Sequence, residues 1–176
     1  SLNKIGFSAL ASAAIMNLLK KQRDAIGMSI YSNEYEFYAN EKGSERHHQM
    51  LLGKLNAAIQ KPAEKKTTKT YSHLHLIAEK LKRRSLVFLF TDMFQGDAEE
   101  EALFEALQHL KYNKHEVVLF HTFDIKQSYE TAVASYFSEL KLKCGQYRIK
   151  YVAADINESF NKILTTYLVE RQKFGG

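Results

Sequence analysis

One aspartate stands where ligand-binding carboxylates are common in α/β proteins. Asp92 directly follows the mostly apolar run 85–91, which has the composition of a buried central strand. Ligands of parallel sheets bind just past the carboxyl ends of the strands, so an aspartate at this position can reach one. Its carboxylate, together with a nearby hydroxyl, suits a hard cation such as Mg²⁺. The alternative is that Asp92 only caps the turn before the next helix.

A group of threonines offers such a hydroxyl. Thr67, Thr68 and Thr70 stand just before a predicted helix over 71–83, which leads into the strand that Asp92 follows. The loop that carries them is expected at the same end of the sheet, where a threonine can ligate a metal or hold a water on it. The alternative is simple N-capping of the helix by Thr70.

Two further aspartates and five histidines complete the candidates. Asp124 and Asp155 stand near the ends of two other predicted strands, an arrangement that Mg²⁺-dependent phosphotransfer also uses. His121 ends the apolar strand 116–122 and is expected to point toward the crevice, behind the ligands. The remaining histidines considered lack the i, i+4 spacing of a helical zinc pair and are expected to face solvent from their helices; they are His47, His48, His73 and His75.

Motifs for nucleophilic or nucleotide chemistry are missing from the sequence. There is no G-x-S-x-G, no Walker loop and no G-x-G-x-x-G, and the 8 glycines do not cluster. A pyrophosphate would lack its usual cradle of backbone N–H groups. These patterns argue against a dehydrogenase or an NTPase, and we expect a protein that is not an enzyme.

Composition favours one globular domain over residues 1–176. The net charge is +5, and its densest parts, 61–69 and 82–84, are expected to be solvated, which predicts no nucleic-acid partner. No apolar run approaches the ~20 residues that cross a bilayer, so no membrane contact is expected. The single cysteine, Cys144, fits a small buried hydrophobe, and the lack of a disulfide pair favours a cytoplasmic location.

The hydrophobic patterning predicts an α/β fold with a mostly parallel sheet and helices on both faces. A polar pair between two alternating segments predicts a hairpin whose second strand is an antiparallel edge strand. Strand–helix alternation in the second half predicts right-handed parallel units. Asn3, Ser44 and Asn157 are expected N-caps. The expected helices are 5–22, 44–59, 71–83, 97–111, 129–144 and 157–171, and the expected strands are 25–31, 34–38, 85–91, 116–122 and 148–153.

Two stretches of sequence carry a family resemblance. Residues 12–31, with the run Leu-Leu-Lys-Lys-Gln-Arg-Asp-Ala-Ile-Gly-Met at 18–28, and residues 81–94, around Asp92, together resemble a bacterial family filed as domain of unknown function 58. Residues 148–152 and 168–171 fit the same family. The resemblance covers most of the chain in order.

The resemblance implies a fold and a role. That family is similar to von Willebrand factor A domains, and its members are associated with MoxR-type AAA+ ATPases as protein-interaction or assembly modules. The wider fold carries a metal-ion-dependent adhesion site made of a D-x-S-x-S loop, a loop threonine and a later aspartate. Asp92 matches the later aspartate, and either Thr68 or Thr70 matches the threonine.

The sequence departs from the family pattern in three places. The D-x-S-x-S loop is absent, and so is the strand that should precede the first helix, which would lie between the strands 25–31 and 85–91. The connection between Asp124 and Tyr129 is also shorter than the resemblance implies. The domain is therefore expected to be N-terminally incomplete, with no tightly bound cofactor in this chain and Mg²⁺ only in a complete protein.

Two functions follow as expectations. The first is a non-enzymatic interaction module that works with an AAA+ ATPase through a partial adhesion site at Asp92, Thr70 and Thr68. The alternative is a Mg²⁺-dependent phosphatase or phosphotransfer domain that uses the strand-end aspartates.

Overall fold

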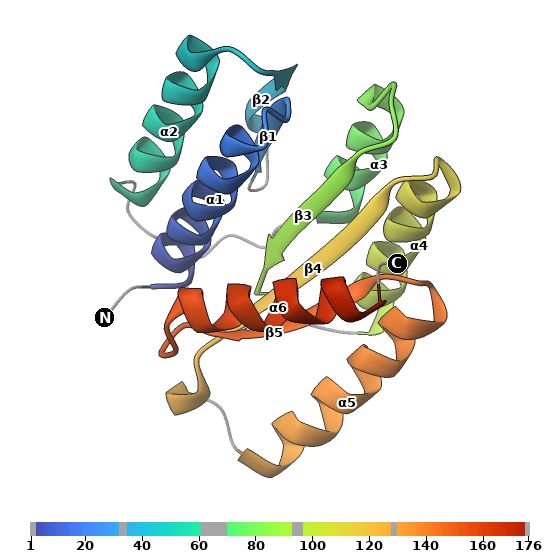
Figure 1. The fold of residues 1–176 in the computed structure, drawn as a ribbon. Coiled ribbons are helices and arrows are strands. Elements are labelled where there is room, and N and C mark those ends of the chain that lie inside the picture. The colour runs from blue at the N-terminus through green and yellow to red at the C-terminus, as the bar shows by residue number, and fades with distance from the viewer. Residues whose placement is uncertain (1–2, 32–34, 61–69, 93–96, 128–129, 175–176) are drawn as a thin grey trace.

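The computed structural model describes residues 3–31, 35–60, 70–92, 97–127 and 130–174 (Figure 1). Helices and strands alternate along the second half of the chain, as the apolar patterning predicts. The elements are α1 Lys4–Lys21, β1 Ile26–Tyr31, β2 Tyr35–Lys42, α2 Glu45–Gln60, α3 Thr70–Lys80, β3 Leu86–Thr91, α4 Asp97–Tyr112, β4 Glu116–Phe123, the 3₁₀ turn η1 Ile125–Gln127, α5 Glu130–Gln146, β5 Lys150–Asp155 and α6 Phe160–Phe174.

A parallel sheet of order β3-β4-β5 forms the centre of the fold. Its middle strand, β4, is buried from Val117 to Thr122. Side chains alternate along a strand, so Val117 and Leu119 pack on one face while Val118 and Phe120 pack on the other. A strand covered on both faces needs an uninterrupted apolar run, and this run is why β4 could be predicted from the sequence.

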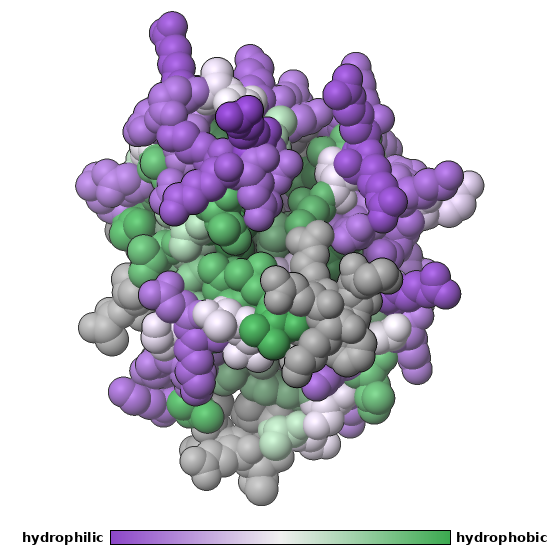
Figure 2. Space-filling model, in the orientation of Figure 1, coloured by the Kyte–Doolittle hydropathy of each residue, from purple (hydrophilic) through white to green (hydrophobic). Residues whose placement is uncertain are grey.

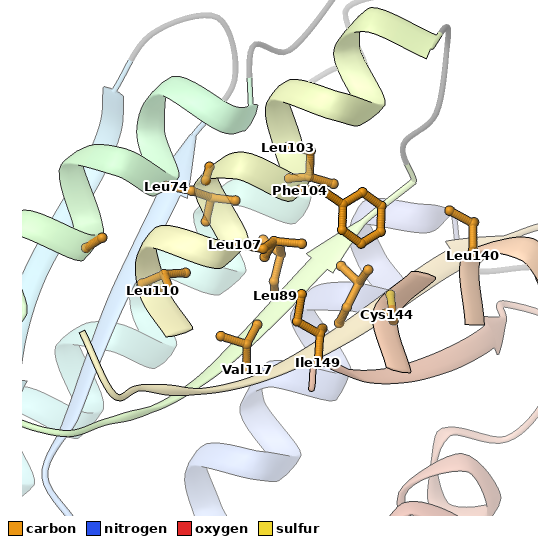
Figure 3. Close-up of a cluster of buried hydrophobic side chains, with 13 residues drawn as sticks. Leu74, Leu89, Leu103, Phe104, Leu107, Leu110, Val117, Leu140, Cys144 and Ile149 are labelled. Atoms are coloured by element: carbon orange, nitrogen blue, oxygen red, sulfur yellow. The ribbon is translucent and has the colours of Figure 1, made fainter. Parts of the chain in front are cut away.

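One face of this sheet is covered by α3, α4 and α5 (Figure 3). Helix α4 contributes the most buried side chains, among them Leu103, Phe104 and Leu107. Helix α5 closes the far side with Leu140 and Cys144. The prediction that Cys144 is a buried hydrophobe is confirmed, because its side chain is fully enclosed in this cluster.

The opposite face is covered by α1 and α6. Phe7 of α1 meets Phe160 of α6 edge to face, with ring centroids 5.9 Å apart. Helix α1 begins where predicted, because the Asn3 side chain accepts a hydrogen bond from the Gly6 N–H at 2.7 Å. Ser44 caps α2 in the same way through the N–H of His47.

The hairpin strands form a sheet of their own. Strands β1 and β2 pair antiparallel, and their apolar side chains pack on α1 and α2 around Met16, Leu51 and Leu55. Among the described strands, neither β1 nor β2 pairs with β3. The single mostly parallel sheet expected from the sequence is therefore divided into an antiparallel pair and a parallel triplet, because a groove separates β1 from β3.

Several expected helical or strand ends are wrong, and strand β2 continues past its expected end at 38 to Lys42. Helix α3 ends at Lys80, before the basic residues 82–84. Strand β5 begins at Lys150 because Arg148 takes a left-handed turn conformation with φ of 55°. Helix α6 begins at Phe160, where the Ser159 carbonyl accepts the first helical hydrogen bonds, so Asn157 is not its N-cap.

The expectation that the helix histidines face solvent is also wrong for three of them. His47 and His48 are buried, with Nε2 atoms 2.9 Å from the Ile26 carbonyl oxygen and 3.0 Å from Asn17 Oδ1. His73 is buried and stacks on Tyr31. These side chains fasten α2 and α3 to the hairpin and to α1, so their role is structural.

None of the helices in the described part of the chain combines the length and apolar character needed to cross a membrane.

Candidate functional site

Asp92 follows directly on β3, at the carboxyl end of that strand. Its side chain is 63% exposed, so the carboxylate is accessible from solvent. The preceding residue, Thr91, is buried, and its carbonyl accepts a hydrogen bond from the Thr122 hydroxyl of β4 at 3.2 Å. The end of β3 is thereby fixed to β4, and Asp92 stands on a rigid support.

The Asp92 carboxylate has a cationic neighbour that no sequence pattern indicated. Lys4 Nζ, at the start of α1, lies 3.4 Å from Asp92 Oδ2. Both side chains line one end of the groove between β1 and β3. A divalent cation at Asp92 would take the position of this ammonium group.

His121 lies behind Asp92, at the neighbouring position of β4. It is paired in register with Thr91, and its side chain is 4% exposed. Its Nδ1 and the Tyr151 hydroxyl of β5 share a hydrogen bond at 2.9 Å. Burial, and then the positive charge of Lys4, lower the pKa of His121 to about 4, although the negative charge of Asp92 opposes them. The imidazole is therefore neutral near pH 7, where it can accept a proton only weakly.

The threonine group lies mainly outside the described residues. Thr67 and Thr68 fall in 61–69, which lie outside the described residues. Thr70 is the first residue of α3, and only its backbone is described. The rest of α3 packs beside α4 on one face of the sheet (Figure 1). The prediction that Thr68 or Thr70 faces Asp92 therefore stays a prediction.

Asp124 and Asp155 lie together at the same end of the sheet as Asp92, where β4 and β5 end. The Asn157 side-chain amide donates to Asp124 Oδ1 at 2.7 Å and to Asp155 Oδ1 at 2.9 Å. The backbone N–H of Asn157 also donates to Asp155. The sequence pattern assigned Asn157 to helix capping, and only the fold shows that it joins the ends of β4 and β5.

The carboxylates of Asp92, Asp124 and Asp155 do not gather at one site. Among the described residues, no three His, Cys, Asp or Glu side chains are grouped so that they can hold a metal ion. Asp92 pairs with Lys4, whereas Asp124 and Asp155 share Asn157.

A groove of about 1550 Å³ extends from Asp92 along the space between β1 and β3. One wall comes from α1, with Ser8, Ala9 and Ser12, and the opposite wall comes from α3 and α4. Figure 2 shows apolar side chains gathered in the middle of one face of the molecule, framed by hydrophilic residues. The groove therefore combines an apolar interior with charged rims.

Comparison with known proteins identifies one family. The family model described as "Protein of unknown function DUF58" matches residues 2–128, which include α1, the hairpin and Asp92. No curated protein and no solved structure matches the chain significantly. Because the family model covers well over half of the sequence, this chain belongs to the DUF58 family of proteins of unknown function.

Proposed function

We propose that this chain is a non-enzymatic protein-interaction module that works with a MoxR-type AAA+ ATPase. The observation that carries the proposal is the exposed carboxylate of Asp92 at the rim of the groove, held at the end of a buried sheet. A module that recognises a protein partner needs such an accessible charged group on a rigid element. The parallel sheet with helices on both faces supports a von Willebrand factor A-like fold for the module.

The proposed contact is bridged by Mg²⁺. Asp92 supplies one oxygen ligand, Thr68 or Thr70 supplies a hydroxyl, and an acidic residue of the ATPase supplies another carboxylate. Mg²⁺ prefers oxygen ligands in octahedral geometry and keeps several waters when the protein offers few of them. The module alone therefore binds the ion weakly, and the partner completes the site.

The test is the affinity of the purified module for a purified MoxR-type AAA+ ATPase from the same source. Asp92→Asn removes the carboxylate charge with little change in shape and is expected to weaken binding at least about tenfold. Glu116→Gln is the matched control, since Glu116 also pairs with an exposed cation, Arg84, but at the opposite end of the sheet. Equal affinities of the wild type and Asp92→Asn would refute the bridged contact.

A Mg²⁺-dependent phosphatase is the second candidate function. The observation in its favour is that Asp124 and Asp155 lie together, both bound to Asn157, at the carboxyl ends of β4 and β5. Mg²⁺ held by such carboxylates can polarise a phosphoryl oxygen. Hydrolysis of p-nitrophenyl phosphate that requires Mg²⁺ and disappears in Asp124→Asn would establish this function in place of the first.

A further inference from the structure

Four helices end at the same end of the fold, beside the starts of the strands that follow them. Helices α1, α3, α4 and α5 each lead into a strand through a short turn, at 22–25, 81–85, 113–115 and 147–149. In units of this kind the helix runs back along the sheet, so the turns gather at the amino ends of the strands. Helix α1 also runs back, because Lys4 in its first turn contacts Asp92 at the other end of β3. In Figure 1, α1, α3 and α4 end at the top of the view, where β3 and β4 begin.

The turns at this end carry an excess of cations. Their exposed Lys and Arg side chains, with those of the last two residues of α1, are Lys20, Lys21, Arg23, Lys82, Arg83, Arg84, Lys114 and Arg148. Lys20 pairs with Glu45, and Arg84 pairs with Glu116. The other six form no ion pair with any residue in the described part of the chain, and we call these six the basic face. Figure 2 shows that hydrophilic side chains cover this end of the molecule.

Three members of the basic face occupy strained backbone positions. Arg23, Lys114 and Arg148 follow the ends of α1, α4 and α5, and their φ angles are 62°, 65° and 55°. Glycine is usual at this position, because a Cβ crowds the backbone there. The partial negative charge at a helix end also attracts a cation, but a lysine in the last turn, such as Lys21, supplies one without strain. A basic side chain at all three positions therefore indicates a use for the charge itself.

The opposite end of the sheet is acidic. Asp92, Asp124 and Asp155 lie where β3, β4 and β5 end, and three successive glutamates at 99–101 lie in the first turns of α4. Within the four turns at the basic end, in contrast, Asp24 is the single acidic residue. Charge is thus separated along the direction of the strands, and the resulting field orients the basic face toward a negatively charged surface.

We propose that the basic face binds the surface of a membrane that contains anionic phospholipids. The contact is peripheral: the ammonium and guanidinium groups bind phosphate and carboxylate groups of the lipid headgroups, and no segment enters the bilayer. The sequence-based expectation of no membrane contact rested on the lack of an apolar segment, which a contact through headgroups does not need. The proposal does not depend on the contact with an ATPase, because Asp92 lies at the opposite end of the sheet and stays exposed.

The shape of the basic face favours a membrane over a nucleic acid. Adjacent turns at one edge of a sheet present no helix that could enter a DNA groove. Among the large apolar and aromatic side chains described as exposed, Tyr112 is the one that lies beside these turns, so the face lacks a row of aromatic side chains for base stacking. A bilayer surface requires neither feature, because each exposed Lys or Arg near it adds its own attraction.

The test measures binding of the purified protein to sedimented lipid vesicles. Vesicles of phosphatidylcholine mixed with phosphatidylserine are compared with vesicles of phosphatidylcholine alone. The test variant combines Arg23→Gly, Lys114→Gly and Arg148→Gly, which removes three cations and relieves the strained backbone, so the fold is retained. The control variant combines Lys54→Gln, Lys126→Gln and Lys162→Gln, which removes the same charge from exposed positions outside the basic face.

The wild type is expected to bind the mixed vesicles at least about tenfold more tightly than the neutral ones, and added salt should weaken that binding. The glycine variant should lose at least about tenfold in affinity for the mixed vesicles, while the glutamine variant loses much less. Equal affinities of the wild type and the glycine variant, or equal losses in the two variants, would overturn the proposal. Binding of the wild type to double-stranded DNA but not to the mixed vesicles would also overturn it.

Discussion

Lys4 and Asp92 form an ion pair that joins the first turn of α1 to the end of β3, with Lys4 Nζ 3.4 Å from Asp92 Oδ2. The two residues are 88 positions apart in the sequence. His121 lies close enough for both charges to act on its pKa. The candidate site is therefore a set of interacting charges in which the cation of Lys4 lies against the carboxylate of Asp92.

The Lys4–Asp92 pair is expected to contribute little to stability. Its side chains are 40% and 63% exposed, and exposed pairs are typically worth less than about 1 kcal/mol. Asp92→Asn should therefore change the free energy of unfolding by no more than about 1 kcal/mol, measured by urea denaturation. A much larger loss would mean that the carboxylate has a structural role, and its exposure would not then indicate a binding site.

The stability of the protein is expected to fall in mild acid because of His121. Burial, assisted by Lys4, lowers the pKa of this imidazole from 6.5 to about 4 in the folded protein. Between these values the unfolded chain binds a proton that the folded chain does not. The free energy of unfolding therefore decreases as pH falls through this window, by roughly 3 kcal/mol in total from this group.

His121→Gln isolates that contribution. Glutamine retains a hydrogen-bonding side chain beside Tyr151 but has no proton to gain, so the slope of stability against pH between about 6.5 and 4 should become shallower. A slope remains from His115, whose pKa burial also lowers, and from Glu45, whose pKa is lowered by the hydrogen bond from Lys20. Denaturant titrations at several pH values measure the difference, and parallel curves for the two proteins would show that His121 titrates normally.

Cys144 is expected to be unreactive in the folded protein. Burial, and then the charge of Glu100, raise the pKa of its thiol from 9.0 to about 12. The thiolate is the reactive form, so its population at neutral pH falls roughly a thousandfold. Labelling with a thiol-specific disulfide reagent should be slow in buffer and rapid in denaturant. Fast labelling in buffer would show that α5 opens readily from the sheet.

Substitution of Leu107 tests the packing of the hydrophobic core beneath α4. Its side chain is fully buried among α3, α4 and the sheet (Figure 3), so Leu107→Ala should lower the free energy of unfolding by about 2–5 kcal/mol. Leu142→Ala is the matched control, because Leu142 is 70% exposed on α5 and should change stability by less than about 0.5 kcal/mol. Similar losses in both variants would contradict the packing described.

The order of elements in the second half could be predicted because local pattern determines it. Two apolar runs, ending at Thr91 and Thr122, have the length and composition of central strands, and helical spacing separates them. The caps Asn3 and Ser44 were predictable for the same reason, since each acts within its own first turn.

Contacts between distant residues could not be predicted in this way. The burial of His47 depends on the Ile26 carbonyl, which the fold brings to α2 from another element. The link from Asn157 to Asp124 likewise requires β4 and β5 to be adjacent and in register. The separation of β1 from β3 has no local signature, because the pattern within a strand does not identify which strand lies beside it.

The most direct test of the proposed function is the Mg²⁺ dependence of binding between this module and a purified MoxR-type AAA+ ATPase. Affinities of the wild type and of Asp92→Asn are measured in Mg²⁺ and in EDTA. If Mg²⁺ bridges the contact, it tightens binding of the wild type at least about tenfold and has no effect on Asp92→Asn, since a bridging ion requires that carboxylate. Binding of the wild type that is equally tight in EDTA, or a Mg²⁺ effect that persists in Asp92→Asn, would refute the bridged contact.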